Sequence, residues 1–97
     1  MISYKYKVKF TSQFKKSFKK IQKQGKNIQE IMDVINILSK GEELDIKYKN
    51  HNLIDDKHFK DCCECHIRPD WLLVYRYNHG ELILFMVDTG SHSDIFR

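Results

Sequence analysis

A strict alternation of apolar and charged side chains opens this chain. Between Tyr4 and Phe10, the aromatic and Val residues fall on one side and Lys5, Lys7 and Lys9 fall on the other. Because side chains in a β-strand alternate with a period of two, this pattern predicts a half-buried strand with its lysine side in water.

Two segments with apolar residues at helical spacing follow. The first is expected over residues 12–24, with Thr11 or Ser12 as its N-cap and Gly25 at its end. The second is expected over residues 27–41. Their buried stripes are Phe14, Phe18 and Ile21 in the first and Ile28, Ile31, Met32, Ile35 and Leu38 in the second. The short link between them predicts an antiparallel helix pair.

After a polar, irregular stretch over residues 41–59, three apolar segments predict strands at 61–67, 71–77 and 81–87. Asn78-His79-Gly80 predicts a tight hairpin turn between the last two. The last segment is apolar on both sides, as in a strand that is covered on both sides. The order β-α-α-β-β-β predicts an α+β fold in one domain, residues 1–97. Two antiparallel helices are expected to pack on one face of a mainly antiparallel four-stranded sheet.

Composition and charge narrow the class of protein. With 97 residues and 41% hydrophobic residues, the chain is long enough for one core. Three closely spaced cysteines form no disulfide framework, and no apolar run suits a membrane, so we expect a cytoplasmic protein. The net charge of +4 is uneven, because residues 1–40 hold ten lysines against two acidic residues. This basic half suits a phosphate backbone or an acidic protein, or it is only a solvated lysine surface.

Candidate chemistry lies at strand ends and turns. Strand alternation places Cys63, Cys65 and Ile67 in the core, and it places Glu64 and His66 together on the other side. The bend at Pro69 could bring Asp70 near His66. The polar segments add His51 and His92. Imidazoles and carboxylates that remain solvated can exchange protons near neutral pH, so a small basic protein with this set is a candidate for cutting RNA.

Each of these features also has an ordinary structural interpretation. His58 and His79 are expected to be solvated surface residues, and a structural ion pair would account for Glu64 beside His66. Trp71 at a strand start is most often a core residue, and Phe96 could simply anchor the C-terminal tail. The neighbouring cysteines diverge on a strand and lack a second pair at zinc-finger spacing, so no metal site is expected.

Three blocks of sequence, taken together, resemble a known family. They are Tyr48-Lys49-x-His51, Glu64-Cys65-His66-Ile67-x-Pro69-Asp70-Trp71-Leu72-Leu73-Val74-Tyr75 and Thr89-Gly90-Ser91-His92-Ser93-Asp94-x-Phe96. Their order and spacing resemble the YafQ branch of the RelE/ParE toxin superfamily over nearly the whole chain. The resemblance implies the toxin of a type II toxin–antitoxin pair, a ribosome-dependent endoribonuclease that cleaves mRNA and is held inactive by a cognate antitoxin.

The resemblance also implies a set of site residues. Catalytic candidates are His51, Glu64, His66, Asp70 and His92; candidates for substrate binding are Lys49, Trp71, Arg76 and Phe96. The lysines of the first helix, Lys15, Lys16, Lys19, Lys20 and Lys23, are expected to contact ribosomal RNA. Family members often have Asp in place of Glu64, and many carry Arg in place of Asp88, which removes a plausible phosphate clamp here.

Metal-independent attack by the RNA 2′-hydroxyl needs only a base, an acid and cationic groups around the phosphate, so no cofactor is expected. We assign Asp70, coupled to His66, as the base and His92 as the acid, although the two roles could be exchanged. Protonated His51 and His66 would bind phosphate, and Trp71 and Phe96 would stack on bases. Two alternatives differ in class: a ParE-like topoisomerase inhibitor that cuts no RNA, and a non-catalytic basic module that binds nucleic acid.

Overall fold

A computed structural model describes residues 5–54 and 56–96 of the chain; Tyr4, in the first predicted strand, lies outside them. The elements in chain order are β1 (Lys7–Phe10), α1 (Ser12–Lys23), α2 (Ile28–Ser39), the 3₁₀ helix η1 (Ile46–Tyr48), β2 (His51–Asn52), β3 (Cys63–Arg68), β4 (Trp71–Asn78), β5 (Ile83–Gly90) and α3 (His92–Ile95). The α+β class is confirmed. None of the helices in the described part of the chain has the length and apolarity needed to cross a membrane.

The described strands form one five-stranded sheet in the order β1-β5-β4-β3-β2, so the expected number of four strands is wrong. The additional strand is β2, a polar two-residue segment that pairs with β3 through His51↔Glu64 and Asn52↔Cys63. β1 runs parallel to β5, and the other pairs are antiparallel. Two residues are too few to show a hydrophobic period in the sequence. This strand is defined only by its pairing with β3, which is distant in the chain.

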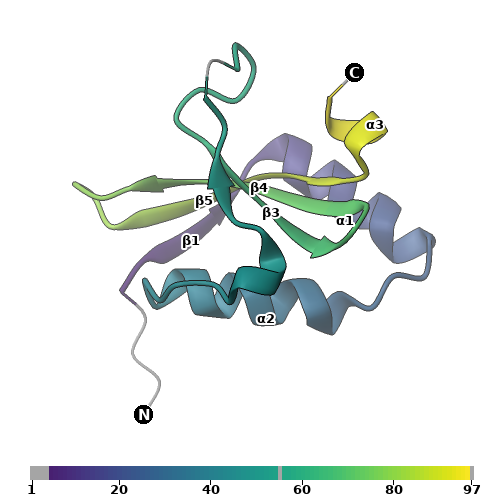
Figure 1. Cartoon of the computed structure of the whole chain (residues 1–97), viewed down its shortest axis with the longest axis horizontal. Helices are drawn as coiled ribbons and strands as arrows, with labels where there is room; N and C mark the ends of the chain where they lie inside the picture. Colours follow the sequence, from purple (N-terminus) through teal and green to yellow (C-terminus); the bar gives the residue numbers. More distant parts are fainter. Residues whose placement is uncertain (1–4, 55, 97) are drawn as a thin grey trace.

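The two long helices end within two residues of their predicted limits. Thr11 caps α1 by accepting a hydrogen bond from the backbone N–H of Phe14, and Asn27 caps α2 by accepting one from Gln29. α1 and α2 run antiparallel, as expected (Figure 1). Their buried residues join Leu73, Leu84 and Met86 of the strands in one core. We call this side of the sheet the helix face.

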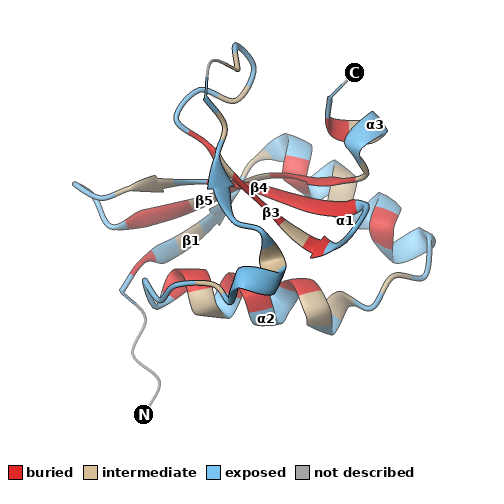
Figure 2. Ribbon diagram, in the orientation of Figure 1, coloured by how far each residue is buried: buried red, intermediate tan, exposed pale blue. Residues whose placement is uncertain are grey.

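The opposite side of the sheet, here called the site face, has a smaller apolar cluster. Leu72 and Val74 of β4 pack there with Cys62 and with Ile95 of α3. Figure 1 shows α2 on one side of the sheet and α3 with the loop residues 56–62 on the other. In Figure 2, buried residues are concentrated along β3, β4 and β5, which are covered from both sides.

Two local predictions need correction. The hairpin loop between β4 and β5 comprises residues 79–82, two residues beyond the predicted end of the turn, because Asn78 pairs directly with Ile83. β5 also continues to Gly90 instead of ending near Val87, and the short helix α3 follows it. These two changes place His92 at the start of a helix at the end of the sheet.

Candidate active site

The predicted alternation in β3 is confirmed. Cys65 and Ile67 belong to the core of the helix face, while Glu64 and His66 lie on the site face. Glu64 is only 3% exposed. One of its carboxylate oxygens, Oε1, lies 3.5 Å from Nε2 of His66 and 3.6 Å from Nε2 of His51. A buried carboxylate is costly unless it is paired, and two imidazoles supply that pairing.

Hydrogen bonds of the preceding residues, Lys49 and Asn50, fix the position of His51. Lys49 adopts a left-handed conformation with φ of 49°, and its carbonyl lies 2.8 Å from Nδ1 of His51. A carbonyl can only accept, so Nδ1–H donates and Nε2 is directed at Glu64. The neighbouring Asn50 accepts a 2.6 Å hydrogen bond from the hydroxyl of Tyr75 in β4. Register with β3 and these bonds together hold the imidazole over the carboxylate.

His92 is the first residue of α3, and its position is set by a capping box. The Ser91 side chain accepts from the N–H of Asp94, and the Asp94 carboxylate accepts from the N–H of Ser91. Gly90 has φ of +150°, and a Cβ there would lie 3.1 Å from the Asp94 side chain. A residue with a side chain would therefore disturb the start of this helix.

Asp70, in the bend between β3 and β4, holds the His92 ring. Its Oδ1 accepts from the backbone N–H of His92 and from Nδ1, each at 3.1 Å. These two donors hold the pKa of the Asp70 carboxyl below its usual range. Because the carboxylate can only accept, Nδ1 carries a proton and Nε2 is the ring nitrogen left for chemistry.

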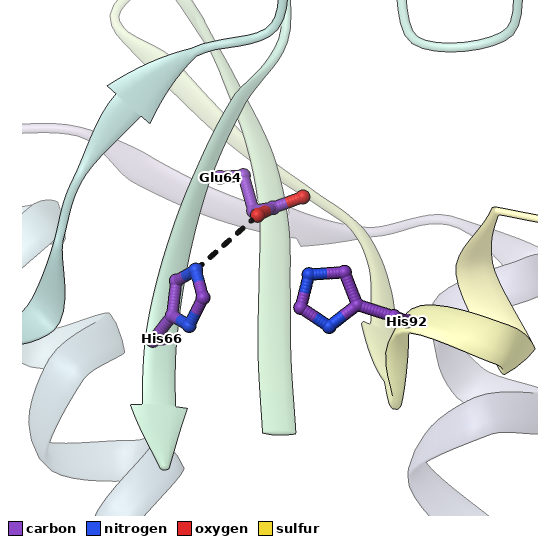
Figure 3. A group of neighbouring side chains, drawn as sticks. All are labelled: Glu64, His66 and His92. Atoms are coloured by element: carbon purple, nitrogen blue, oxygen red, sulfur yellow. Dashed lines mark ion pairs between the residues drawn. The ribbon is translucent and has the colours of Figure 1, made fainter. Parts of the chain in front are cut away.

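Figure 3 shows the His66 and His92 rings on either side of the Glu64 carboxylate, with both rings turned toward it. The His66 ring centroid lies 5.8 Å from that of His92 and 6.3 Å from that of His51. We refer to His51, Glu64, His66 and His92 as the histidine cluster. Three separate segments of the chain thus bring their imidazoles together around one negative charge.

The cluster is also suited to a divalent metal ion. One ligand atom each from Glu64, His66 and His92 lies within 4.8 Å of the others. Two imidazoles and a carboxylate are typical ligands of Zn²⁺, Cu²⁺ and Ni²⁺. Sequence reasoning considered the three cysteines as metal ligands, and no cysteine joins such a group in the described part of the chain.

The remaining predicted site residues are more scattered. Trp71 is 2% exposed in the core of the helix face and donates from Nε1 to Thr89, so the prediction that its ring stacks on a base is wrong. Arg76 lies over the Phe85 ring, at 4.8 Å from its centroid. Phe96, 38% exposed, borders the cluster with its ring 6.2 Å from that of His92. Asp88 accepts a 2.5 Å hydrogen bond from Ser17.

Of the five predicted α1 lysines, Lys20 binds Asp94 of α3 at 2.8 Å, and the other four form no ion pair with residues in the described part of the chain. This contact, with the N–H of Ser91, holds the pKa of Asp94 at about 2. His79, expected to be merely solvated, has its Nδ1 2.8 Å from the hydroxyl of Tyr6. The ring of His79 also stacks on Tyr77.

Sequence reasoning missed a polar pocket beside His66. It has a volume of about 410 Å³, and Lys47, Tyr48, Lys49 and Arg68 contribute to its lining. Arg68 forms an ion pair with Glu30 of α2, which ties the end of β3 to that helix. The family block around Tyr48-Lys49 was the available signal for this pocket, but only folding brings η1 beside β3.

Comparisons with known proteins identify the family of this chain. The sequence model of a family described as "Bacterial toxin of type II toxin-antitoxin system, YafQ" matches residues 6–97. The mRNA interferase toxin YafQ of Escherichia coli strain B / BL21-DE3 is 28% identical over 90 residues, which cover 92% of this chain and 94% of that protein.

Solved structures have the same fold. The metal-bound toxin from Helicobacter pylori superposes with a TM-score of 0.86 at 36% identity, over 94% of this chain and 99% of that chain. The DinJ–YafQ toxin–antitoxin complex of E. coli gives 0.85 at 26% identity, over 96% of this chain and 99% of that chain.

Proposed function

This chain belongs to the YafQ family of toxins of type II toxin–antitoxin systems, and we propose on that premise that it is an mRNA interferase, an endoribonuclease that inhibits translation. The observation that carries the proposal is the convergence of His51, His66 and His92 on the buried carboxylate of Glu64. A topoisomerase inhibitor or a simple nucleic-acid-binding module would have no use for this arrangement.

RNA supplies the nucleophile for its own cleavage, and the protein must supply the proton transfers. The 2′-hydroxyl is the nucleophile, so the protein must take its proton, give one to the leaving 5′-oxygen and stabilise the charged phosphorane. Positioned acid and base groups contribute about 10²–10⁴-fold each. Cationic donors aimed at the developing charge are often the larger contribution.

We assign His66 as the base and His92 as the acid. The earlier assignment of Asp70 as the base changes, because both hydrogen bonds to its Oδ1 come from His92. Asp70 is therefore a positioning residue that leaves Nε2 of His92 directed at the cluster. Glu64 stabilises the positive charge that His66 gains with the proton, and His51, when charged, adds a cation for the phosphate.

The pocket beside His66 supports binding of the adjoining nucleotide. Lys47 and Lys49 give it cationic groups and Tyr48 gives it a ring, while Glu30 and Asp33 also line it and Glu30 pairs with Arg68. Phe96, at the opposite edge of the cluster beside His92, supplies an exposed ring on which a base can stack. Stacking of this kind contributes about 1–3 kcal/mol per base.

A divalent metal would compete with this chemistry. Glu64, His66 and His92 would hold it, and the bound ion would supply Lewis acidity at that position. Coordination needs the same nitrogen lone pairs that accept and return protons in the proposed reaction. The solved H. pylori relative is described as metal-bound. We therefore treat a metal as an inhibitory ligand of this chain.

A cognate antitoxin, the ribosome and its mRNA are the proposed partners, and the cytoplasm is the proposed compartment. The E. coli relative was solved in complex with the antitoxin DinJ. The lysines of α1 suit ribosomal RNA, so ribosome binding should weaken steeply as salt rises. Each phosphate contact contributes a slope of about −0.7 to −0.9 in a log–log plot against salt concentration.

The proposal is tested by primer extension of mRNA on purified ribosomes, with ribosome-free mRNA in parallel. The parent protein should cleave only in the presence of ribosomes. Replacing His92→Gln should slow cleavage by about 10²-fold or more, since it removes the proposed acid. His58→Gln is the matched control, because His58 is an exposed histidine outside the cluster.

Equal cleavage by the two histidine variants would show that the cluster is not the active site. Cleavage of free mRNA at the same rate would remove the ribosome from the proposal. If no mRNA is cut and a topoisomerase is inhibited instead, the ParE-like alternative is correct.

A further inference from the structure

A second polar pocket lies at the end of the sheet, next to the pair formed by Asp70 and His92. Its volume is about 760 Å³. It forms where three segments meet, namely the link between α1 and α2, the bend between β3 and β4, and the start of α3 (Figure 1). These segments contribute Lys26, Asp70 and Ser91 to its lining. The pocket therefore adjoins the residue that positions the proposed acid.

Lys26 is the cationic side chain that the link between the two helices brings to this pocket. Its Nζ lies 5.7 Å from the centroid of the Trp71 ring, which is within the range at which an indole attracts a cation. The ring itself is fixed, because Trp71 is buried and donates from Nε1 to Thr89. The backbone N–H of Lys26 donates to the carbonyl of Ile21 at 3.2 Å, which fixes the link. Trp71 is too buried to stack on a base, but it supports an ammonium group beside the active site.

The charges around Lys26 leave its ammonium group without an ion pair. Three carboxylates also line the pocket, and each is already paired: Glu30 with Arg68, Asp94 with Lys20, and Asp70 with His92. Lys26 itself forms no ion pair with residues in the described part of the chain. The hydrogen bonds from His92 lower the pKa of Asp70 most, and the charge of Lys26 lowers it further. The ammonium group is therefore close enough to act on charges beside His92.

The roles of the two histidines give the direction of the RNA across the site. In the proposed mechanism His66 takes the proton of the 2′-hydroxyl, so the nucleotide before the cut lies on its side. His92 protonates the leaving 5′-oxygen, so the nucleotide after the cut lies on the His92 side. Nε2 of His92 is directed at the cluster, while Nδ1 is bonded to Asp70, which lines the pocket. RNA that continues in the 3′ direction beyond His92 therefore leads to the pocket.

We propose that Lys26 is a further substrate-binding residue, which binds the phosphate on the 3′ side of the leaving nucleotide; this inference rests on the proposed function. An ammonium group without an ion pair suits a phosphate better than a neutral base. The Ser93 hydroxyl and the side-chain amides of Gln24 and Asn27 line the same pocket, and they are neutral donors for ribose and phosphate oxygens. Trp71 serves the substrate indirectly, because it holds the lysine and not a base.

The test combines a change in the protein with a change in the mRNA. Lys26→Met removes the charge and keeps an aliphatic chain against Trp71, so the fold should survive. In the mRNA, a neutral methylphosphonate replaces the phosphate on the 3′ side of the leaving nucleotide. A 2′-O-methyl group on that nucleotide, present in both mRNAs, keeps this linkage from breaking by itself. Cleavage is measured by primer extension on programmed ribosomes over a range of toxin concentrations.

The two changes should each remove the same contact. Lys26→Met should lower kcat/KM on the unmodified phosphate by about tenfold, the size expected for a hydrogen bond to a charged group. The methylphosphonate should lower kcat/KM of the parent by a similar factor, but that of Lys26→Met by less than about twofold. Lys26→Arg keeps a cation and should remain within about threefold of the parent.

Lys40→Met is the matched control, because it removes the same charge from an exposed lysine at the other end of α2. It should cleave within about twofold of the parent, since it lies outside every proposed contact. A loss in Lys40→Met equal to that in Lys26→Met would show only the effect of net charge, and would overturn the proposal.

Cleavage by Lys26→Met within about twofold of the parent, with its fold intact by thermal melting, would also overturn the proposal. Independent losses, in which the methylphosphonate slows Lys26→Met as much as the parent, would show that Lys26 acts through Asp70 and not on the phosphate, and would overturn it too. Failure of the nuclease proposal gives a different result, because the parent would then leave the unmodified mRNA uncut and the inference would fall with it.

Discussion

Replacing Glu64→Gln is expected to separate catalysis from folding in this protein. The substitution keeps the size of the side chain and removes the one negative charge at the centre of the histidine cluster. Glu64 is 3% exposed, and Nε2 of His66 lies 3.5 Å from its Oε1. The charge therefore acts on the proposed base at short range with little water between them.

The size of the effect follows from that distance. Two unit charges 3.5 Å apart attract by about 5 kcal/mol at an effective dielectric constant of about 20. In the proposed mechanism His66 gains positive charge as it accepts the 2′-hydroxyl proton, so this attraction stabilises the transition state more than the ground state. With the proton about half transferred, roughly 2–3 kcal/mol is lost in Glu64→Gln, or about 30- to 150-fold in rate.

The stability of the fold should respond differently. A neutral amide avoids the cost of burying a carboxylate, so the free energy of unfolding at pH 7 is expected to stay within about 1 kcal/mol of the parent or to rise. Single-turnover primer extension on programmed ribosomes gives the rate, and urea unfolding gives the stability. Glu64→Asp keeps the charge and serves as the control, with a smaller loss of rate.

Cleavage by Glu64→Gln within about threefold of the parent, while His92→Gln is inactive, would refute the electrostatic role of Glu64. An unfolded Glu64→Gln protein would refute the stability argument, since it would show that the ion pairs hold the site face together. Equal losses in the Gln and Asp variants would indicate that the shape of the site matters more than its charge.

Three further predictions concern groups around the cluster. Asp70→Asn should slow cleavage about tenfold at neutral pH and shift the pH–rate profile, because it removes the carboxylate that holds His92. The bond to His92 lowers the Asp70 pKa, so its contribution is present above the unfolded pKa and is lost as pH falls through the folded value. An unchanged profile would contradict this positioning role. The Asp94 pKa of about 2 means that its bond to Lys20 stabilises the fold above the unfolded pKa of about 3.9 and loses this contribution as pH falls to about 2. Lys20→Met should therefore flatten the fall in stability over this window in acid titrations followed by circular dichroism, and an identical titration would show that the pair adds nothing. Zn²⁺ added to the cleavage assay should inhibit the parent, and a chelator should restore the rate without itself changing the parent's activity; stimulation by Zn²⁺ would mean that the metal takes part in the reaction.

Local sequence patterns carried much of this fold because the long elements are defined by local periodicity. The helical spacing in α1 and α2 and the caps at Thr11 and Asn27 place both helices correctly. Period-two alternation in β3 predicted that Glu64 and His66 share a face, which the structure confirms. The polar segments and the family blocks both pointed to His51 and His92, but no local pattern could relate their positions to β3.

The errors have non-local causes. β2 exists only because residues 51 and 52 pair with β3, and two polar residues carry no period. α3 has four residues, so its one local signal was the Ser91-x-x-Asp94 capping box, which was overlooked. Trp71 was assigned to the site because of its motif, but its place in the β4 register directs the ring into the core of the helix face. The burial of Glu64 depends on what covers the sheet and could not be read from neighbouring residues.

The alternation of β3 has an evolutionary consequence. Because successive side chains in the central strands serve opposite sides of one sheet, changes in the core of the helix face can accumulate while the catalytic side stays fixed. Chimaeras that graft the α1–α2 hairpin of one paralogue onto the strands of another should accordingly keep the cleavage pattern of the recipient sheet.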